Sequence, residues 1–318
     1  LLVLLGLLSY INATTLQPMI FVFSSLLIGF MKMMVTIELF LPLMMMIGNR
    51  GMFYGVFYTF VLVMNQVAVY YSAEFALLYN WQQFYILTSV LCFILALIHW
   101  IFMHDKYFAL KVPLHYIDWL SIILFISAFM FSAYVYSFGR QQDWLNSKNI
   151  ISASIAAFVS FALLTIRQLT LKRPYLSFKI FTRNNVLHGL FMLFWLGMFL
   201  GTATLQNTFA VGVLGYDLLT NAWLSMLMIP GIIVAGAIAI FWFKKEKPLK
   251  MYIFSGFSAM MGYVIIMYFS MVLEFNYDNW YLPMFLKGYG MCSLFISVWF
   301  YTLDKLEMND MLAAIGLV

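Results

Sequence analysis

Residues 219–243 read LTNAWLSMLMIPGIIVAGAIAIFWF, residues 244–250 read KKEKPLK, and residues 251–273 read MYIFSGFSAMMGYVIIMYFSMVL. Each of the two longer segments exceeds the roughly 20 mostly apolar residues that an α-helix needs to cross a bilayer. The segment between them holds four lysines, and short loops rich in lysine and arginine stay on the cytoplasmic side. This pattern predicts two membrane-spanning helices joined by a cytoplasmic loop.

The composition extends this prediction to the whole chain of 318 residues. Hydrophobic residues make up 65% of the chain and charged residues 9%, and the mean hydropathy is +0.95, far from the values of soluble domains. The net charge of +5 is spread over short segments and forms no stripe of the kind that binds nucleic acid. We expect an all-α polytopic membrane protein that contacts the lipid bilayer and no nucleic acid.

The apolar runs predict nine complete spans and two partial ones. One partial run covers 1–14, and another begins near Met311, so we expect the chain to be cut within a span at both ends. The complete runs lie at roughly 18–47, 51–72, 83–103, 116–137, 150–166, 185–206, 219–243, 251–273 and 279–303.

The basic residues predict on which side of the membrane each gap between runs lies. Thirteen of the 17 lysines and arginines lie in every second gap, whereas the other gaps hold only Arg140 and Lys148. Because cytoplasmic loops retain basic residues, the gaps with the thirteen should face the cytoplasm. The two remaining lysines, Lys32 and Lys287, lie inside apolar runs, where function can be sought.

Lys32 and Glu38 share the run 18–47. A charge in hydrocarbon costs about 3 kcal/mol or more, and six residues of helix place the two side chains about 240° apart, so each needs a partner on another helix or water. One hypothesis makes Glu38 the proton-coupling group of a central cavity, with Lys32 as its charge partner or as an anion-binding group. The alternative is that Lys32 extends to the membrane surface and that Glu38 lies near the inner interface.

Further polar side chains inside spans are candidates for the lining of a cavity. Lys287 lies about eight residues from the outer end of its run, where it either lines a cavity or extends outward. The amides and hydroxyls could contact a substrate or form hydrogen bonds between helices. These candidates are Asn65, Gln66, Tyr70, Gln206 and Asn207.

Motifs of enzymes and metal sites are missing from the sequence. It has no HExxH, no serine elbow and no glycine-rich phosphate loop. His99 and His104 are five residues apart, a poor spacing for two ligands on one helix face, although Asp105 and His115 lie nearby. We therefore expect no catalytic residues, no metal and no cofactor.

The segments that carry a family resemblance are RPYLSFKIFTRNN at 173–185, LQNTFAVGVLGYDLLTNAWLSMLMIPG at 205–231 and FLKGYGMCS at 285–293. They resemble the 14-span drug:proton antiporter branch of the major facilitator superfamily. RPYLSFKIFTRNN at 173–185 is similar to the link between the central extra spans and the second half of those proteins. LQNTFAVGVLGYDLLTNAWLSMLMIPG at 205–231 resembles their Gln, Gly-Tyr and Pro-Gly pattern, and FLKGYGMCS at 285–293 resembles a span with a basic residue followed by Gly-x-Gly. The family's glycine-rich antiporter motif should fall near residues 66–71, but 65–71 reads NQVAVYY.

This resemblance implies a domain division and a function. The chain would cover spans 3 to 13 of the family: 1–112 the end of the N-terminal half, 113–172 the central pair of extra spans, and 173–318 the C-terminal half. The implied function is proton-coupled efflux of small amphipathic compounds by alternating access in the bacterial cytoplasmic (inner) membrane. The departure at 65–71 keeps uptake of a nutrient or metabolite open, and a membrane-embedded enzyme or sensor subunit is a further alternative.

Overall fold

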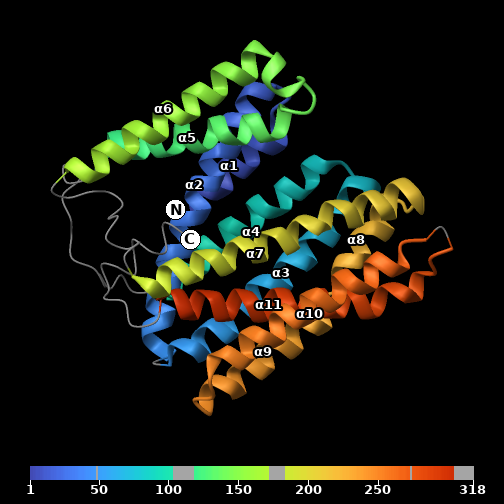
Figure 1. Ribbon diagram of the computed structural model, residues 1–318. Coiled ribbons are helices and arrows are strands. Elements are labelled where there is room, and N and C mark those ends of the chain that lie inside the picture. The colour runs from blue at the N-terminus through green and yellow to red at the C-terminus, as the bar shows by residue number, and fades with distance from the viewer. Residues whose placement is uncertain (48, 103–117, 172–182, 273, 304–318) are drawn as a thin grey trace. The chain divides into compact units, whose positions relative to one another are not determined.

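The described part of the chain is almost entirely helical (Figure 1). The computed structural model describes residues 1–47, 49–102, 118–171, 183–272 and 274–303; 89% of these are helical, and no strand occurs among them. In chain order the elements are α1 (Leu2–Thr14), α2 (Pro18–Ile47), α3 (Arg50–Leu78), α4 (Trp81–Phe102), α5 (Trp119–Phe138), η2 (Trp144–Asn146), α6 (Lys148–Thr170), α7 (Asn184–Asn207), η4 (Thr208–Val213), α8 (Leu218–Met226), α9 (Ile229–Lys244), α10 (Leu249–Ser270), η5 (Tyr277–Trp280) and α11 (Tyr281–Leu303).

The predicted complete spans are confirmed as helices. Within the described ranges, nine helical segments are long and apolar enough to cross a membrane. The first partial run is the shorter apolar helix α1, and the run that begins near Met311 lies outside the described residues. The nine segments are Pro18–Phe40, Arg50–Leu78, Trp81–Phe102, Trp119–Phe138, Lys148–Thr170, Asn184–Val213, Leu218–Lys244, Leu249–Ser270 and Tyr277–Leu303.

The chain forms two compact units. One comprises Leu1–Phe108 and Phe191–Tyr301, and the other comprises Ala109–Leu190 and Thr302–Val318. Helices α5 and α6, which correspond to the predicted central pair of extra spans, belong to the second unit. Helices α1 to α4 share the first unit with α8 to α10 and with most of α7 and α11. The finer division into halves at 1–112 and 173–318 stays a prediction.

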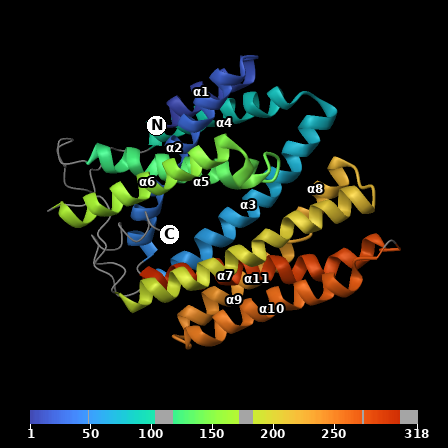
Figure 2. The same cartoon turned by 45° about the horizontal axis from the view of Figure 1, so that its top comes forward.

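Within the first unit, helix α11 packs beside α7, α9 and α10 (Figure 2). Glycines bring α9 and α11 into backbone contact. A Cβ added at Gly231 would collide with the carbonyl oxygen of Phe285, and one added at Gly288 would collide with the carbonyl oxygen of Met228. Small residues of this kind let helices in a membrane approach closely, where dispersion contacts and not hydrophobicity hold them together.

Aromatic rings fill the predicted cytoplasmic ends of α2, α3, α9 and α11. Tyr58 of α3 stacks on Trp299 of α11 with centroids 6.0 Å apart, and Phe243 of α9 lies 4.7 Å from Phe300. Offset and edge-to-face ring pairs of this kind add to the dispersion energy of the packing. We call this set the inner aromatic cluster: Phe40, Phe53, Tyr54, Phe57, Tyr58, Phe243, Phe295, Trp299 and Phe300.

Two spans of the first unit depart from a regular α-helix. The run 219–243 divides into two helices: α8 ends at Met226, and α9 begins at Ile229. Pro230 follows this break, and proline cannot donate a backbone hydrogen bond to the carbonyl four residues earlier. The end of α7 continues as the π-helix η4, Thr208–Val213. Both departures lie in the halves of the spans that we predict to be on the outer side.

In the second unit, an ion pair joins the predicted cytoplasmic ends of α5 and α6. Arg167 donates from Nη2 to Oδ1 of Asp118 over 2.8 Å and from Nε to both carboxylate oxygens over 3.2 Å. Asp118 also caps α5 by accepting from the backbone N–H of Ser121 and from its hydroxyl. The hydrogen bond from Arg167 lowers the pKa of Asp118 first, and those from Ser121 lower it further.

A first prediction concerns this ion pair. Asp118→Asn should lower the melting temperature of the full-length protein at pH 7, because it removes the charge that Arg167 contacts. A carboxylate whose pKa is lowered by folding stabilises above its usual pKa of about 3.9 and loses that contribution as the pH falls through the lowered value. The difference in melting temperature between the wild type and the variant should therefore become smaller below about pH 4.

Thermal unfolding in detergent, followed by tryptophan fluorescence between pH 3 and pH 7, measures both effects. Asp143→Asn is the matched control, because Asp143 is exposed and makes no side-chain capping bond. An Asp118→Asn variant as stable as this control at pH 7 would contradict the prediction.

A second prediction concerns the contact between α9 and α11. Gly288→Ala should lower the free energy of unfolding by about 1–3 kcal/mol, the usual effect of overpacking, because the new methyl group meets the backbone oxygen of Met228, the N-cap residue of α9. Gly262→Ala is the control, since its nearest neighbour would be 3.5 Å away and alanine favours a helix over glycine. Equal stability of the two variants in thermal unfolding would show that the helices do not approach as described.

Candidate functional site

Three buried polar side chains meet where α7, α10 and α11 converge. They are Gln206 of α7, Tyr263 of α10 and Lys287 of α11. Lys287 donates from Nζ to Oε1 of Gln206 over 2.6 Å, and the Tyr263 hydroxyl donates to the same oxygen over 3.1 Å. The Nζ atom also lies 5.1 Å from the centroid of the Tyr263 ring. We call these three residues the lysine site.

The lysine site lies deep in the membrane-spanning part of the first unit. Lys287 is ten residues beyond Tyr277, the start of its span, which is about 15 Å of helix in a hydrocarbon core of roughly 30 Å. Tyr263 and Gln206 each lie seven residues before the ends of their spans, Ser270 and Val213, or about 10 Å. All three therefore lie in the half of the membrane that we predict to be on the outer side, with Lys287 close to the middle of its span.

The charge of Lys287 has no ionic partner within the described part of the chain. The side chain is 5% exposed, and no carboxylate of the described residues lies within 4.0 Å of its Nζ. The ammonium contacts the carbonyl oxygen of Gln206 and lies near the Tyr263 ring, whose face carries a partial negative charge. Both side chains have no net charge. They orient the ammonium and offset part of its desolvation, but they do not balance its charge.

Two of the predicted cavity residues, Lys287 and Gln206, are brought into direct contact by the structure. They lie 81 positions apart in the chain, so sequence spacing could not pair them. Tyr263 was not among the predicted candidates. Its signal was its place inside the run 251–273, well away from the span ends where tyrosines gather at the membrane surface.

The other candidates of α3 and α7 form no hydrogen bond with the lysine site in the described part of the chain. Gln66 is buried, Asn65 and Asn207 are exposed, and Tyr70 is half-buried. The Tyr70 ring meets the ring of Trp223 edge to face, with centroids 5.2 Å apart. Their proposed contact with a substrate stays a prediction.

Lys32 and Glu38 are both exposed on α2. Neither side chain forms an ion pair or a hydrogen bond with any residue in the described ranges, so the structure does not pair them with each other. The hypothesis that Glu38 titrates during transport stays a prediction.

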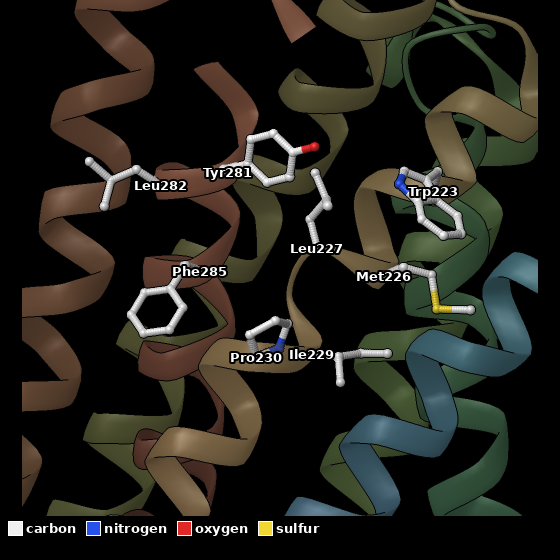
Figure 3. A pocket seen from close by; sticks show the side chains of 8 residues that line it. All are labelled: Trp223, Met226, Leu227, Ile229, Pro230, Tyr281, Leu282 and Phe285. Carbon is white, nitrogen blue, oxygen red and sulfur yellow. The ribbon is translucent and has the colours of Figure 1, made fainter. Parts of the chain in front are cut away.

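An apolar hollow of about 670 Å³ lies between the α8–α9 break and α11 (Figure 3). Phe285 lines it two residues before Lys287, which places the two side chains about 200° apart on α11; the hollow and the lysine site are thus on different faces of that helix. The lining residues are Trp223, Met226, Leu227, Ile229, Pro230, Tyr281, Leu282 and Phe285.

A second, smaller hollow of about 310 Å³ shares Trp223 with the first. Its other lining residues are Tyr70, Leu219, Thr220 and Tyr277. All of these residues are in the halves of their spans that we predict to be on the outer side. The candidate Tyr70 is therefore next to open space, unlike the occluded Lys287.

The described residues include no group of three metal-binding side chains. His104, Asp105 and His115 lie outside the described residues. The expectation that they and His99 bind no metal therefore stays a prediction from the sequence. Cys92 and Cys292 are free thiols. The Cys292 sulfur lies 3.7 Å from the Thr59 hydroxyl.

No model of a known protein family matches the chain, and no curated protein matches it. The site must therefore be interpreted from its own chemistry. A buried lysine held by an amide and a phenol from two other spans can bind an anion or exchange a proton.

A third prediction tests the bond between Lys287 and Gln206. Gln206→Leu should lower the free energy of unfolding by about 3 kcal/mol, because it leaves a buried ammonium without its acceptor. Adding Lys287→Met should restore about half of this loss, because the unpaired charge is then gone.

Thermal unfolding of both variants in detergent measures the effect, with Asn207→Leu as the control at the neighbouring exposed amide. If the double variant is less stable than Gln206→Leu, the ammonium does not depend on Gln206.

Proposed function

We propose that the chain is a secondary active transporter of the major facilitator type. It would export small amphipathic compounds in exchange for protons, by alternating access, across the bacterial cytoplasmic membrane. The observation that carries this proposal is the lysine site, a buried ammonium near the middle of the membrane held by residues of two other spans. Because ionisable residues inside spans are costly, they usually mark the path of a substrate or an ion.

Two features of the fold support the proposal. The break between α8 and α9 and the π-helix after α7 are irregularities of the kind that transporters carry beside their substrate sites. The inner aromatic cluster fills the predicted cytoplasmic ends of four helices, whereas the hollows lie at the predicted outer ends. Such a difference between the two ends is what one state of an alternating-access cycle requires.

The direction of transport distinguishes efflux from uptake. In inverted membrane vesicles an exporter accumulates its compound in the lumen, and an importer depletes the lumen. The fluorescent amphipathic compound dansyl-glycine can be followed in vesicles with an acidic lumen. Accumulation that collapses with nigericin supports proton-coupled efflux, and loss from preloaded vesicles would favour uptake.

An enzyme or sensor subunit would need polar groups that converge at one membrane interface. Asp118, the carboxylate that such a site would use on the cytoplasmic side, is held by Arg167 and Ser121. This arrangement fits a structural clamp and gives the enzyme alternative no support.

A fourth prediction concerns proton coupling. Glu38→Gln in the full-length protein should abolish the proton flux that accompanies transport, because glutamine cannot carry a proton. Substrate-driven alkalinisation in inverted vesicles measures this flux. Glu274→Gln, at an exposed position in a predicted outer gap, should leave the flux unchanged. Coupling that survives Glu38→Gln at the wild-type stoichiometry would remove Glu38 from the mechanism.

A further inference from the structure

We infer that the lysine site binds a carboxylate group of the transported compound. This inference rests on the proposed function and adds to it the chemical class of the substrate, an amphipathic monoanion.

The hydrogen bonds of the site leave N–H donors of Lys287 unused and both lone pairs of the Gln206 oxygen occupied. An ammonium has three N–H donors, and among the described residues Lys287 uses one of them, toward Gln206. The Gln206 oxygen accepts from both Lys287 and Tyr263, so both of its lone pairs are occupied. A ligand that completes the site must therefore accept hydrogen bonds.

The charge of the lysine site favours an anion as its ligand. Lys287 is buried, and within the described ranges no carboxylate lies within 4.0 Å of its Nζ. An isolated ammonium in a medium of low dielectric constant is strongly unfavourable, whereas one paired with an anion and hydrogen-bonded can be accommodated. A cationic compound would instead meet a like charge.

A carboxylate fits the site better than a phosphate ester. One ammonium balances one negative charge, and a phosphate monoester carries close to two at neutral pH.

The depth of the lysine site favours a transported compound over a lipid headgroup as its ligand. Lys287 is about 15 Å of helix from the outer end of its span, well below the headgroups that border a hydrocarbon core of roughly 30 Å.

The end of α7 can let Gln206 move when a ligand arrives. The π-helix η4 begins at Thr208, two residues after Gln206, and single π turns within helices are frequent at functional sites because their hydrogen bonds are less regular. A shift of Gln206 would free a lone pair from Lys287 and expose the ammonium to the carboxylate.

The test compares two probes that differ only in charge. Purified full-length protein in detergent is titrated with dansyl-glycine, which carries a carboxylate, and with dansyl-glycinamide, which is neutral, and binding is followed by dansyl fluorescence. We expect about tenfold tighter binding of the carboxylate, as for one charge-assisted hydrogen bond. Lys287→Met should reduce this preference to about one, and Lys287→Arg should keep most of it.

Lys250→Met is the matched control, because it removes one exposed lysine from α10 and should leave the preference unchanged. Gel filtration shows whether Lys287→Met is folded. If Lys287→Met is not folded, Lys287→Arg carries the test, and an arginine variant without any preference for the carboxylate probe would overturn the inference. Equal affinity of wild type for both probes, binding of neither probe, or a preference that survives Lys287→Met would also overturn it.

Two further experiments are needed. The first distinguishes a transported compound from a lipid headgroup as the source of the anion, and the second tests the carboxylate site separately from the transport function. Displacement of dansyl-glycine by phosphatidylglycerol but not by phosphatidylcholine would assign the site to a lipid headgroup and overturn the inference. Proteoliposomes then report transport of the same probe. Binding that depends on Lys287 without any flux would contradict the proposed transport function and leave the carboxylate site intact.

Discussion

Hydrocarbon offers no hydrogen bonds to peptide groups, and this constraint shapes the whole chain. An α-helix satisfies its own backbone within one segment, so a chain with 65% hydrophobic residues crosses the bilayer as a series of helices. Helix contacts then depend on close packing, which the glycines between α9 and α11 provide. The same constraint makes Lys287 exceptional, because its ammonium needs partners that the lipid cannot supply.

The spans could be predicted from the sequence because hydropathy and span length both follow directly from this constraint. The predicted runs 18–47 and 279–303, for example, match α2 and the segment Tyr277–Leu303 within two residues at each end. The break between α8 and α9 was not predicted, although Pro230 lay in the run. A proline in a membrane helix can be accommodated by neighbouring helices, so its presence alone does not decide between a bend and a break.

The site could be predicted only in part. Lys287 and Gln206 stood out individually as polar groups inside apolar runs, but their contact depends on how α7 and α11 pack, and no local pattern encodes that packing. Tyr263 was missed because a phenol is common at membrane surfaces and its hydroxyl gains meaning only from its neighbour. Lys32 and Glu38 stood out by the same rule, yet they are exposed on α2, which shows that polarity within a span does not by itself identify a buried site.

Gln206 holds the Lys287 ammonium inside the membrane, and this contact can be measured. Solid-state NMR on the full-length protein in lipid bilayers tests it directly, with ¹⁵N-labelled lysine side chains and ¹³C-labelled glutamine side chains. We predict a dipolar coupling between Nζ of Lys287 and Cδ of Gln206 that corresponds to about 3.5 Å, the separation that a lysine-to-carbonyl hydrogen bond imposes, and its loss in Gln206→Leu. A separation beyond about 6 Å, too long for any hydrogen bond, would contradict the account.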